Sequence, residues 1–118
     1  MPNPVCHFEI SGKDYKKSMS FYKDLFDWNI TEYQGMSYGM VSAGADKDAI
    51  GGGIGPVQDG QQPSLTFYVM VDDLQAYLDK AEKLGGKTVV PPTPIPGIGS
   101  FAMFSDLDGN VVGLYKSQ

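Results

Sequence analysis

The chain has 118 residues, of which 42% are apolar and 19% charged, a balance typical of one globular domain with an apolar core. Its formal charge of −5, from 14 acidic and 9 basic residues, disfavours phosphate backbones and anionic lipid, so we expect neither nucleic acid nor a membrane as a partner. The sequence shows no signal-peptide pattern, no apolar run of about 18 residues and a single cysteine, Cys6, so we expect a cytoplasmic protein.

The first half of the chain predicts a strand, a helix and three further short strands. Apolar and polar residues alternate over residues 5–11, as in a half-buried strand. Asp14 is a predicted helix N-cap, and apolar residues follow it at helical spacing. Turn residues separate the three shorter predicted strands, which are residues 28–33, 36–43 and 49–54.

The second half predicts the same order of elements. A strand over residues 65–71 precedes Asp73, a predicted cap, and a helix that ends at Gly85 and Gly86. The apolar stripe predicted for this helix consists of Leu74, Tyr77, Leu78, Ala81 and Leu84. Strands are predicted at residues 87–90, 100–105 and 111–116, whereas the proline-rich residues 91–99 are a predicted loop.

The two halves repeat one another. Asp14 and Asp73 lie 59 residues apart, which is half the length of the chain, and the same offset places Phe8 on Phe67. We therefore predict two tandem βαβββ units, residues 1–57 and 64–118, joined by a linker at residues 58–63. The predicted fold is α+β, with one cupped mixed sheet and both helices on its outer face. A concave sheet favours a small-molecule ligand.

Several motifs occur in a characteristic order. They are His7-Phe8-Glu9-Ile10, Ser20 with the run FYKDLFDW after it, Val71-Asp72-Asp73-Leu74, Leu84-Gly85-Gly86-Lys87, Gly99-Ser100-Phe101-Ala102, and Ser105 with the run DLDGN after it. Together they resemble the vicinal-oxygen-chelate superfamily of glyoxalases, bleomycin-resistance proteins and extradiol dioxygenases, and especially its small glyoxalase-related bacterial members. The resemblance covers nearly the whole chain, apart from Leu107 at a turn position where the family usually has proline. It implies a single domain over residues 1–118 and a homodimer.

The resemblance also implies where a metal would bind. In metal-using members, four ligands come from the first and last strand of each unit, and these positions fall on His7, Thr66, Gly51 and Gly113. Glycine has no ligating side chain, threonine is a poor transition-metal ligand, and His7 is the only histidine. We therefore expect no metal and no cofactor. Two alternatives stay open: a dimer that joins two copies of His7, and a weak divalent-metal site formed by His7, Glu9 and water.

The predicted first strand places His7 and Glu9 on the face that lines the cup, with Phe8 and Ile10 toward the helix. The Cα atoms of His7 and Glu9 would lie about 6.6 Å apart. This pair is the candidate catalytic site, a general base oriented by a carboxylate, or else a polar anchor for a ligand. A purely structural hydrogen-bonded pair is the alternative.

The remaining predicted ligand contacts are mainly aromatic and thioether side chains. Alternation assigns Thr66, Tyr68, Met70 and Tyr115 to the cup; Tyr38, Met40, Phe101 and Met103 lie on strands whose phase the pattern does not fix. The corresponding core positions are Phe67, Val69, Val71, Val112 and Leu114, and Trp28 is also predicted to be core. The glycines at positions 51–53 are predicted to enlarge the cup or to allow close backbone packing.

Three functions are compatible with these features. The favoured one is a protein that binds a small, partly apolar molecule without a transition metal. The second is a glyoxalase-like lyase or isomerase in which His7 or Glu9 transfers a proton. The third is a dimeric interaction module with no catalysis.

Overall fold

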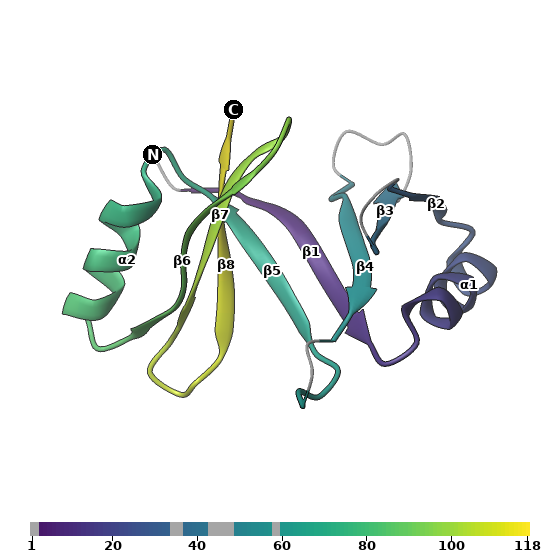
Figure 1. The fold of residues 1–118 in the computed structure, drawn as a ribbon, viewed down its shortest axis with the longest axis horizontal. Coiled ribbons are helices and arrows are strands. Elements are labelled where there is room, and N and C mark those ends of the chain that lie inside the picture. The colour runs from purple at the N-terminus through teal and green to yellow at the C-terminus, as the bar shows by residue number, and fades with distance from the viewer. Residues whose placement is uncertain (1–2, 34–36, 43–48, 58–59) are drawn as a thin grey trace. The chain divides into compact units, whose positions relative to one another are not determined.

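The computed structural model describes residues 3–33, 37–42, 49–57 and 60–118. The chain divides into two compact units, and each is described by itself (Figure 1). The N-terminal unit is His7–Leu65, and the C-terminal unit consists of residues 3–6 together with Thr66–Gln118. Residues 3–6 join the C-terminal unit because Pro4 O accepts from Met70 N at 2.9 Å and Asn3 Nδ2 donates to the Tyr77 hydroxyl at 2.9 Å.

Within the described residues, each half of the chain forms one helix and four strands in the order βαβββ. The first set is β1 (Val5–Gly12), α1 (Tyr15–Phe26), β2 (Asn29–Glu32), β3 (Gly39–Ser42) and β4 (Gly52–Pro56). The second set is β5 (Leu65–Met70), α2 (Leu74–Lys83), β6 (Lys87–Ile95), β7 (Gly99–Ser105) and β8 (Val111–Ser117). Two predictions fall partly outside the described residues: the strand at residues 36–43, at both of its ends, and the linker at residues 58–63, at residues 58 and 59.

The strand order is the same in both units. It is β1-β4-β3-β2 in the first set and β5-β8-β7-β6 in the second. The first and last strands of each set pair in parallel, and the other neighbours pair antiparallel. This shared topology confirms the predicted α+β class and the βαβββ repeat.

The helix boundaries follow from their capping residues. Asp14 accepts a hydrogen bond from Lys17 N, and Asp73 accepts one from Ala76 N, so each carboxylate satisfies a backbone donor in the first turn. α2 is followed by Gly85 in the left-handed region (φ +107°), a conformation that glycine adopts without strain. No helix in the described part of the chain is long and apolar enough to cross a bilayer.

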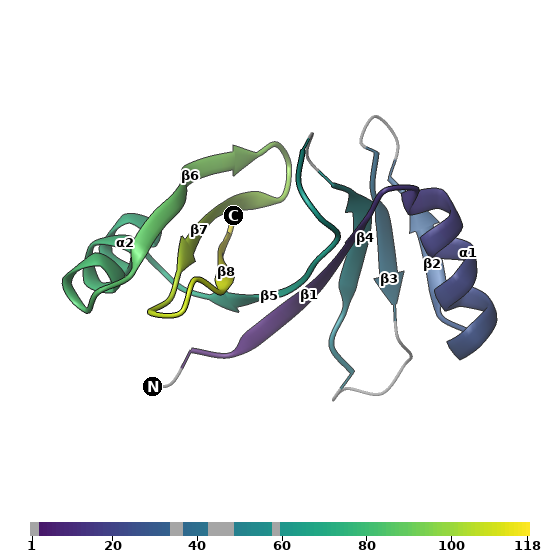
Figure 2. The ribbon, with the colours of Figure 1, turned by 90° about the horizontal axis from the view of Figure 1, so that it is seen from below.

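The C-terminal unit has an apolar core beneath α2, which packs against β6, β7 and β8 (Figure 2). The core contains Val71, Leu74, Leu78, Ala102 and Leu114. The core prediction is wrong for Phe67, and the predicted apolar stripe of the helix does not bury its last member, Leu84. Phe67 is 43% exposed, because α2 packs mainly on the other three strands, and Leu84 is 69% exposed, because it lies just beyond the last helical turn.

An aromatic cluster packs α1 onto the N-terminal unit. The ring centroids of Phe8 and Trp28 are 5.5 Å apart, and those of Tyr22 and Trp28 are 5.7 Å apart with nearly parallel planes. A β-carbon at Gly52 would collide with the Phe8 ring, so this glycine lets the ring lie flat on β4. The predicted direction of Phe8 toward the helix is confirmed, and Trp28 packs in this cluster as a half-buried residue.

The prediction of a loop at residues 91–99 is wrong for its first part. β6 continues to Ile95 and pairs with β7, with two register irregularities between Thr88 and Thr93. Because β6 is an outer strand of its set, it needs backbone partners on one side only, and prolines are tolerated there. The chain reverses just after it, where Gly97 has φ +79° and Ile98 N donates to Ile95 O.

Candidate functional site

The N-terminal unit holds a hydrogen-bonded cluster of three half-buried polar side chains: His7 and Glu9 on β1, and Tyr38 just before β3. The Tyr38 hydroxyl donates to Glu9 Oε2 at 3.0 Å and lies 2.9 Å from His7 Nε2. The three residues are hereafter called the His7 cluster. Strand alternation places it on the face of β1 opposite Phe8 and the aromatic core.

The hydrogen bonds indicate which ring nitrogen of the neutral imidazole carries the hydrogen. A phenol has one hydrogen, and Tyr38 gives it to the Glu9 carboxylate. The Tyr38 oxygen therefore accepts from His7, so His7 Nε2 carries a hydrogen and Nδ1 is the basic nitrogen of the neutral ring. The network orients the imidazole and links it to a negative charge through one hydroxyl.

Burial lowers the pKa of His7 below its ordinary value near 6.5, since removal from water disfavours the imidazolium. The imidazole is therefore neutral at neutral pH. A neutral imidazole in a fixed orientation can accept a proton or a hydrogen bond from a bound molecule.

Two glycines of β4 make room for Tyr38. A β-carbon at Gly53 would collide with the end of the Tyr38 ring, and one at Gly55 would lie 3.0 Å from it. Gly53 pairs with Glu9 on one side and with Met40 on the other, so the tyrosine lies across the strand between them. The predicted enlargement of the cup by glycine is wrong at position 53, because an aromatic ring occupies that space.

The C-terminal unit has a similar arrangement. A β-carbon at Gly113 would collide with the Tyr68 ring, and Gly113 pairs with Tyr68 on β5 and with Met103 on β7. Tyr115 pairs with Met70 and with Phe101 in the next row on the same face.

The registers settle the phase of β7. Phe101 and Met103 share the face of Tyr68, whereas Ala102 lies in the core beneath α2. The structure thus groups most of the predicted ligand contacts on one face of each unit: His7, Glu9, Tyr38 and Met40 in one, and Thr66, Tyr68, Met70, Phe101, Met103 and Tyr115 in the other. Their contact with a ligand stays a prediction.

The comparison with known families follows from this fold. The profile of the Glyoxalase/Bleomycin resistance protein/Dioxygenase superfamily matches residues 5–114. The chain belongs to this superfamily. A superfamily structure, the Mn(II)-bound glyoxalase of Novosphingobium aromaticivorans, superposes with a TM-score of 0.69 at 14% identity, covering 95% of this chain and 37% of that one, and shares its fold.

Relatives by sequence carry glyoxylase names. The putative glyoxylase CFP32 of Mycobacterium bovis is 33% identical over 114 residues, which are 92% of this chain and 44% of that protein. A glyoxylase-like domain-containing protein of Didymella fabae is 28% identical over 120 residues, covering 90% of this chain and 91% of that protein. The chain thus spans less than half the length of the mycobacterial relative.

The superfamily's metal-ligand positions do not fit a transition metal in this chain. Thr66 uses its hydroxyl to donate to Val111 O at 2.6 Å, and Gly113 has no side chain and lies against the Tyr68 ring. The expected match of Gly51 with Gly113 is wrong, since the pairs Glu9–Gly53 and Tyr68–Gly113 are equivalent and make Gly53 the counterpart. No group of three or more His, Cys, Asp or Glu side chains able to hold a metal occurs within the described residues.

The bridge through Tyr38 was not predicted. The pattern around Tyr38 does not define which way its side chain points, so the residue was grouped with general ligand contacts. One usable signal was the alternation of glycines at positions 53 and 55, since glycine on one face of a strand is often covered by an aromatic ring from the next strand.

Proposed function

We propose that this protein binds a small, partly apolar molecule at the His7 cluster and does so without a transition metal. One observation carries the proposal: three half-buried polar side chains are held in a fixed hydrogen-bonded arrangement on a strand face opposite the aromatic core. A few oriented polar groups within an otherwise apolar surface are typical of small-molecule sites. Met40 pairs with Gly53 beside the cluster and offers apolar contact.

The donor set supports binding without a metal. His7 is the one imidazole of the chain, Glu9 accepts from Tyr38, and the equivalent positions in the other unit carry Thr66 and Tyr68. Elemental analysis of the purified protein is therefore expected to find well below one transition-metal ion per chain. One tightly held ion per chain that survives dialysis would contradict this part of the proposal.

A thermal-shift screen of a small-molecule library tests binding. Compounds that raise the melting temperature of the wild type should have a smaller effect on His7→Ala, and an equal effect on the control Tyr33→Phe. A ligand at 100 times its dissociation constant adds about 2.7 kcal/mol to stability, which is readily measured. Equal shifts for the wild type and His7→Ala would remove the His7 cluster from the site.

A second candidate is proton transfer by a glyoxalase-like lyase or isomerase, with His7 as the base and Tyr38 and Glu9 as positioning residues. The lowered pKa of His7 and its link through Tyr38 to a carboxylate favour this activity, and the glyoxylase names of the relatives agree with it. With a substrate from the screen, His7→Gln should abolish turnover, whereas Tyr38→Phe should lower kcat and shift the pH profile.

A homodimer is also part of the proposal, because the resemblance to the superfamily implies one. Sedimentation equilibrium at several concentrations checks it. If no compound binds and the chain still dimerises, the interaction module becomes the better assignment.

A further inference from the structure

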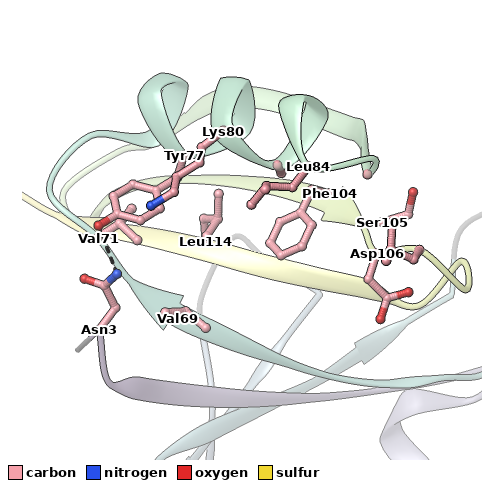
Figure 3. Close-up of a pocket in the computed structure, with 13 residues that line it drawn as sticks. Asn3, Val69, Val71, Tyr77, Lys80, Leu84, Phe104, Ser105, Asp106 and Leu114 are labelled. Carbon is pink, nitrogen blue, oxygen red and sulfur yellow. Dashed lines mark hydrogen bonds between the residues drawn. The ribbon is translucent and has the colours of Figure 1, made fainter.

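A pocket of about 390 Å³ opens between α2 and the strands β5, β7 and β8 of the C-terminal unit (Figure 3). All of its lining residues belong to this unit. Its floor includes Val69 and Leu114, which lie on the face of the sheet opposite Tyr68. The pocket is therefore separate from the His7 cluster and from the residues predicted to line the cup.

The walls of the pocket are apolar. Phe104 and Leu114 form its base, and Leu84 and Leu107 stand at its rim, where they are 69% and 77% exposed. A contiguous apolar hollow with exposed leucines at its edge favours an apolar occupant, because burying such surface removes it from water. Its volume suits a small organic molecule.

One end of the pocket carries hydrogen-bond donors. The Tyr77 hydroxyl accepts from Asn3 Nδ2 at 2.9 Å, which leaves its own hydrogen to donate (Figure 3). Lys80 follows three residues later on α2, so the two side chains share a helix face. Lys80 forms no ion pair with any of the described residues. A phenol and an ammonium side by side are suited to a carboxylate.

The opposite end carries a negative charge. Asp106 lies there (Figure 3). It accepts hydrogen bonds from Asp108 N, Asn110 N and Asn110 Nδ2, so its carboxylate is fixed by the turn that it closes. A fixed anion repels a second anion but leaves the cationic end attractive. The charges of the two ends therefore favour one orientation of a bound anion, with its charged group at the end that carries Lys80.

We propose that this pocket is a second binding site, which takes a molecule with an apolar body and one carboxylate. The carboxylate contacts Tyr77 and Lys80, and the apolar body lies along Phe104 and Leu114 toward the leucine rim. Free medium-chain or aryl carboxylates have this chemistry. The site is independent of the His7 cluster, so neither proposal depends on the other.

Titration with sodium octanoate, followed by ¹H–¹⁵N NMR of the full chain, tests the proposal. Saturable shifts are expected for the amides of Ala81, Leu84 and Ser105, with binding weaker for 1-octanol and weakest for octylammonium. Lys80→Met should weaken octanoate binding about three- to fivefold, the range of a partly exposed ion pair, and leave octanol unchanged. The control Lys83→Met removes a neighbouring charge that does not line the pocket and should have no effect.

A variant that fills the pocket provides an independent check. Ala81→Leu extends a lining side chain into the hollow without disfavouring the helix, so the melting temperature should be maintained while octanoate binding is lost. Three outcomes would each overturn the proposal. The first is an affinity for octylammonium equal to that for octanoate, and the second is an equal effect of Lys80→Met and Lys83→Met on octanoate binding. The third is unchanged octanoate binding by a folded Ala81→Leu variant.

Discussion

The ring of Tyr38 lies directly on Gly53, in space that the β-carbon of any other residue would occupy. The position of the ring determines where its hydroxyl lies, and this hydroxyl contacts both His7 and Glu9. A glycine on β4 therefore controls the geometry of two side chains on β1, although it contacts neither of them with a side chain of its own.

We expect Gly53→Ala to displace Tyr38 and to separate it from His7. Inserting a methyl group into this packed site should cost about 1–3 kcal/mol in the free energy of unfolding, measured by denaturant titration. The matched control is Gly51→Ala, whose β-carbon would lie 3.4 Å from Val41 O, an ordinary contact. That change should leave stability within about 1 kcal/mol. A Gly53→Ala protein as stable as the control would contradict the packing described here.

Tyr38→Phe keeps the ring over Gly53 but removes the bridge. Stability should fall by about 1 kcal/mol, because His7 Nε2 and Glu9 each lose a hydrogen-bond partner in a half-buried site. Tyr33→Phe is the control, since Tyr33 is 41% exposed. The NMR signals of the His7 ring should move in Tyr38→Phe and not in the control; unchanged signals in both would rule out the bridge.

The lowered pKa of His7 predicts how stability depends on pH. The unfolded chain takes up a proton near pH 6.5, whereas the folded chain resists protonation until a lower pH. The contribution of the neutral imidazole to the free energy of unfolding is thus complete above about pH 6.5. It is lost as the pH falls from there through the pKa of His7 in the folded chain.

Melting temperatures of the wild type and His7→Gln between about pH 7.5 and 5 measure this effect. Glutamine keeps a donor for Tyr38 but does not titrate, so its curve should be flatter below pH 6.5. The other ionisable groups are common to both proteins, and parallel curves would exclude a contribution from His7.

The core beneath α2 should account for much of the stability of the C-terminal unit. Leu78 is 1% exposed, and Leu78→Ala should lower the free energy of unfolding by about 2–5 kcal/mol. Leu84→Ala is the matched control, since Leu84 is 69% exposed and its truncation should cost less than about 0.5 kcal/mol. Chemical denaturation measures the free energy of unfolding of both variants. Equal losses in the two would contradict a core centred on Leu78.

Local signals predicted most of the fold. The caps at Asp14 and Asp73 and the periodicity that follows them identified both helices, because capping and amphipathic spacing depend on neighbouring residues. Alternation along β1 separated His7 and Glu9 from Phe8 for the same reason. The repeat then predicted that both halves of the chain have the same sequence of elements, βαβββ.

Contacts between distant segments were harder to predict. The exposure of Phe67 depends on where α2 packs on the sheet. The hydrogen bonds of Tyr38 to His7 and Glu9 depend on the pairing of three strands. The match of Gly51 with Gly113 failed because it compared the short run at residues 49–51 with the run at residues 111–113, and such a comparison does not reveal which residue of β4 or β8 pairs with the first strand of its set. The pocket beneath α2 combines residues from five segments of the chain and has no local motif.

The prolines of β6 affect how this protein meets other copies of itself. Pro91, Pro92 and Pro94 lie on the outermost strand of their set, and none of them has an amide hydrogen to offer to an incoming chain. A strand from another copy that paired with this edge would lack several backbone hydrogen bonds, which disfavours fibril growth along β6. Self-association by strand addition is thus opposed on this flank, while β6 still pairs with β7 at Val90 and Thr93, on either side of Pro91 and Pro92.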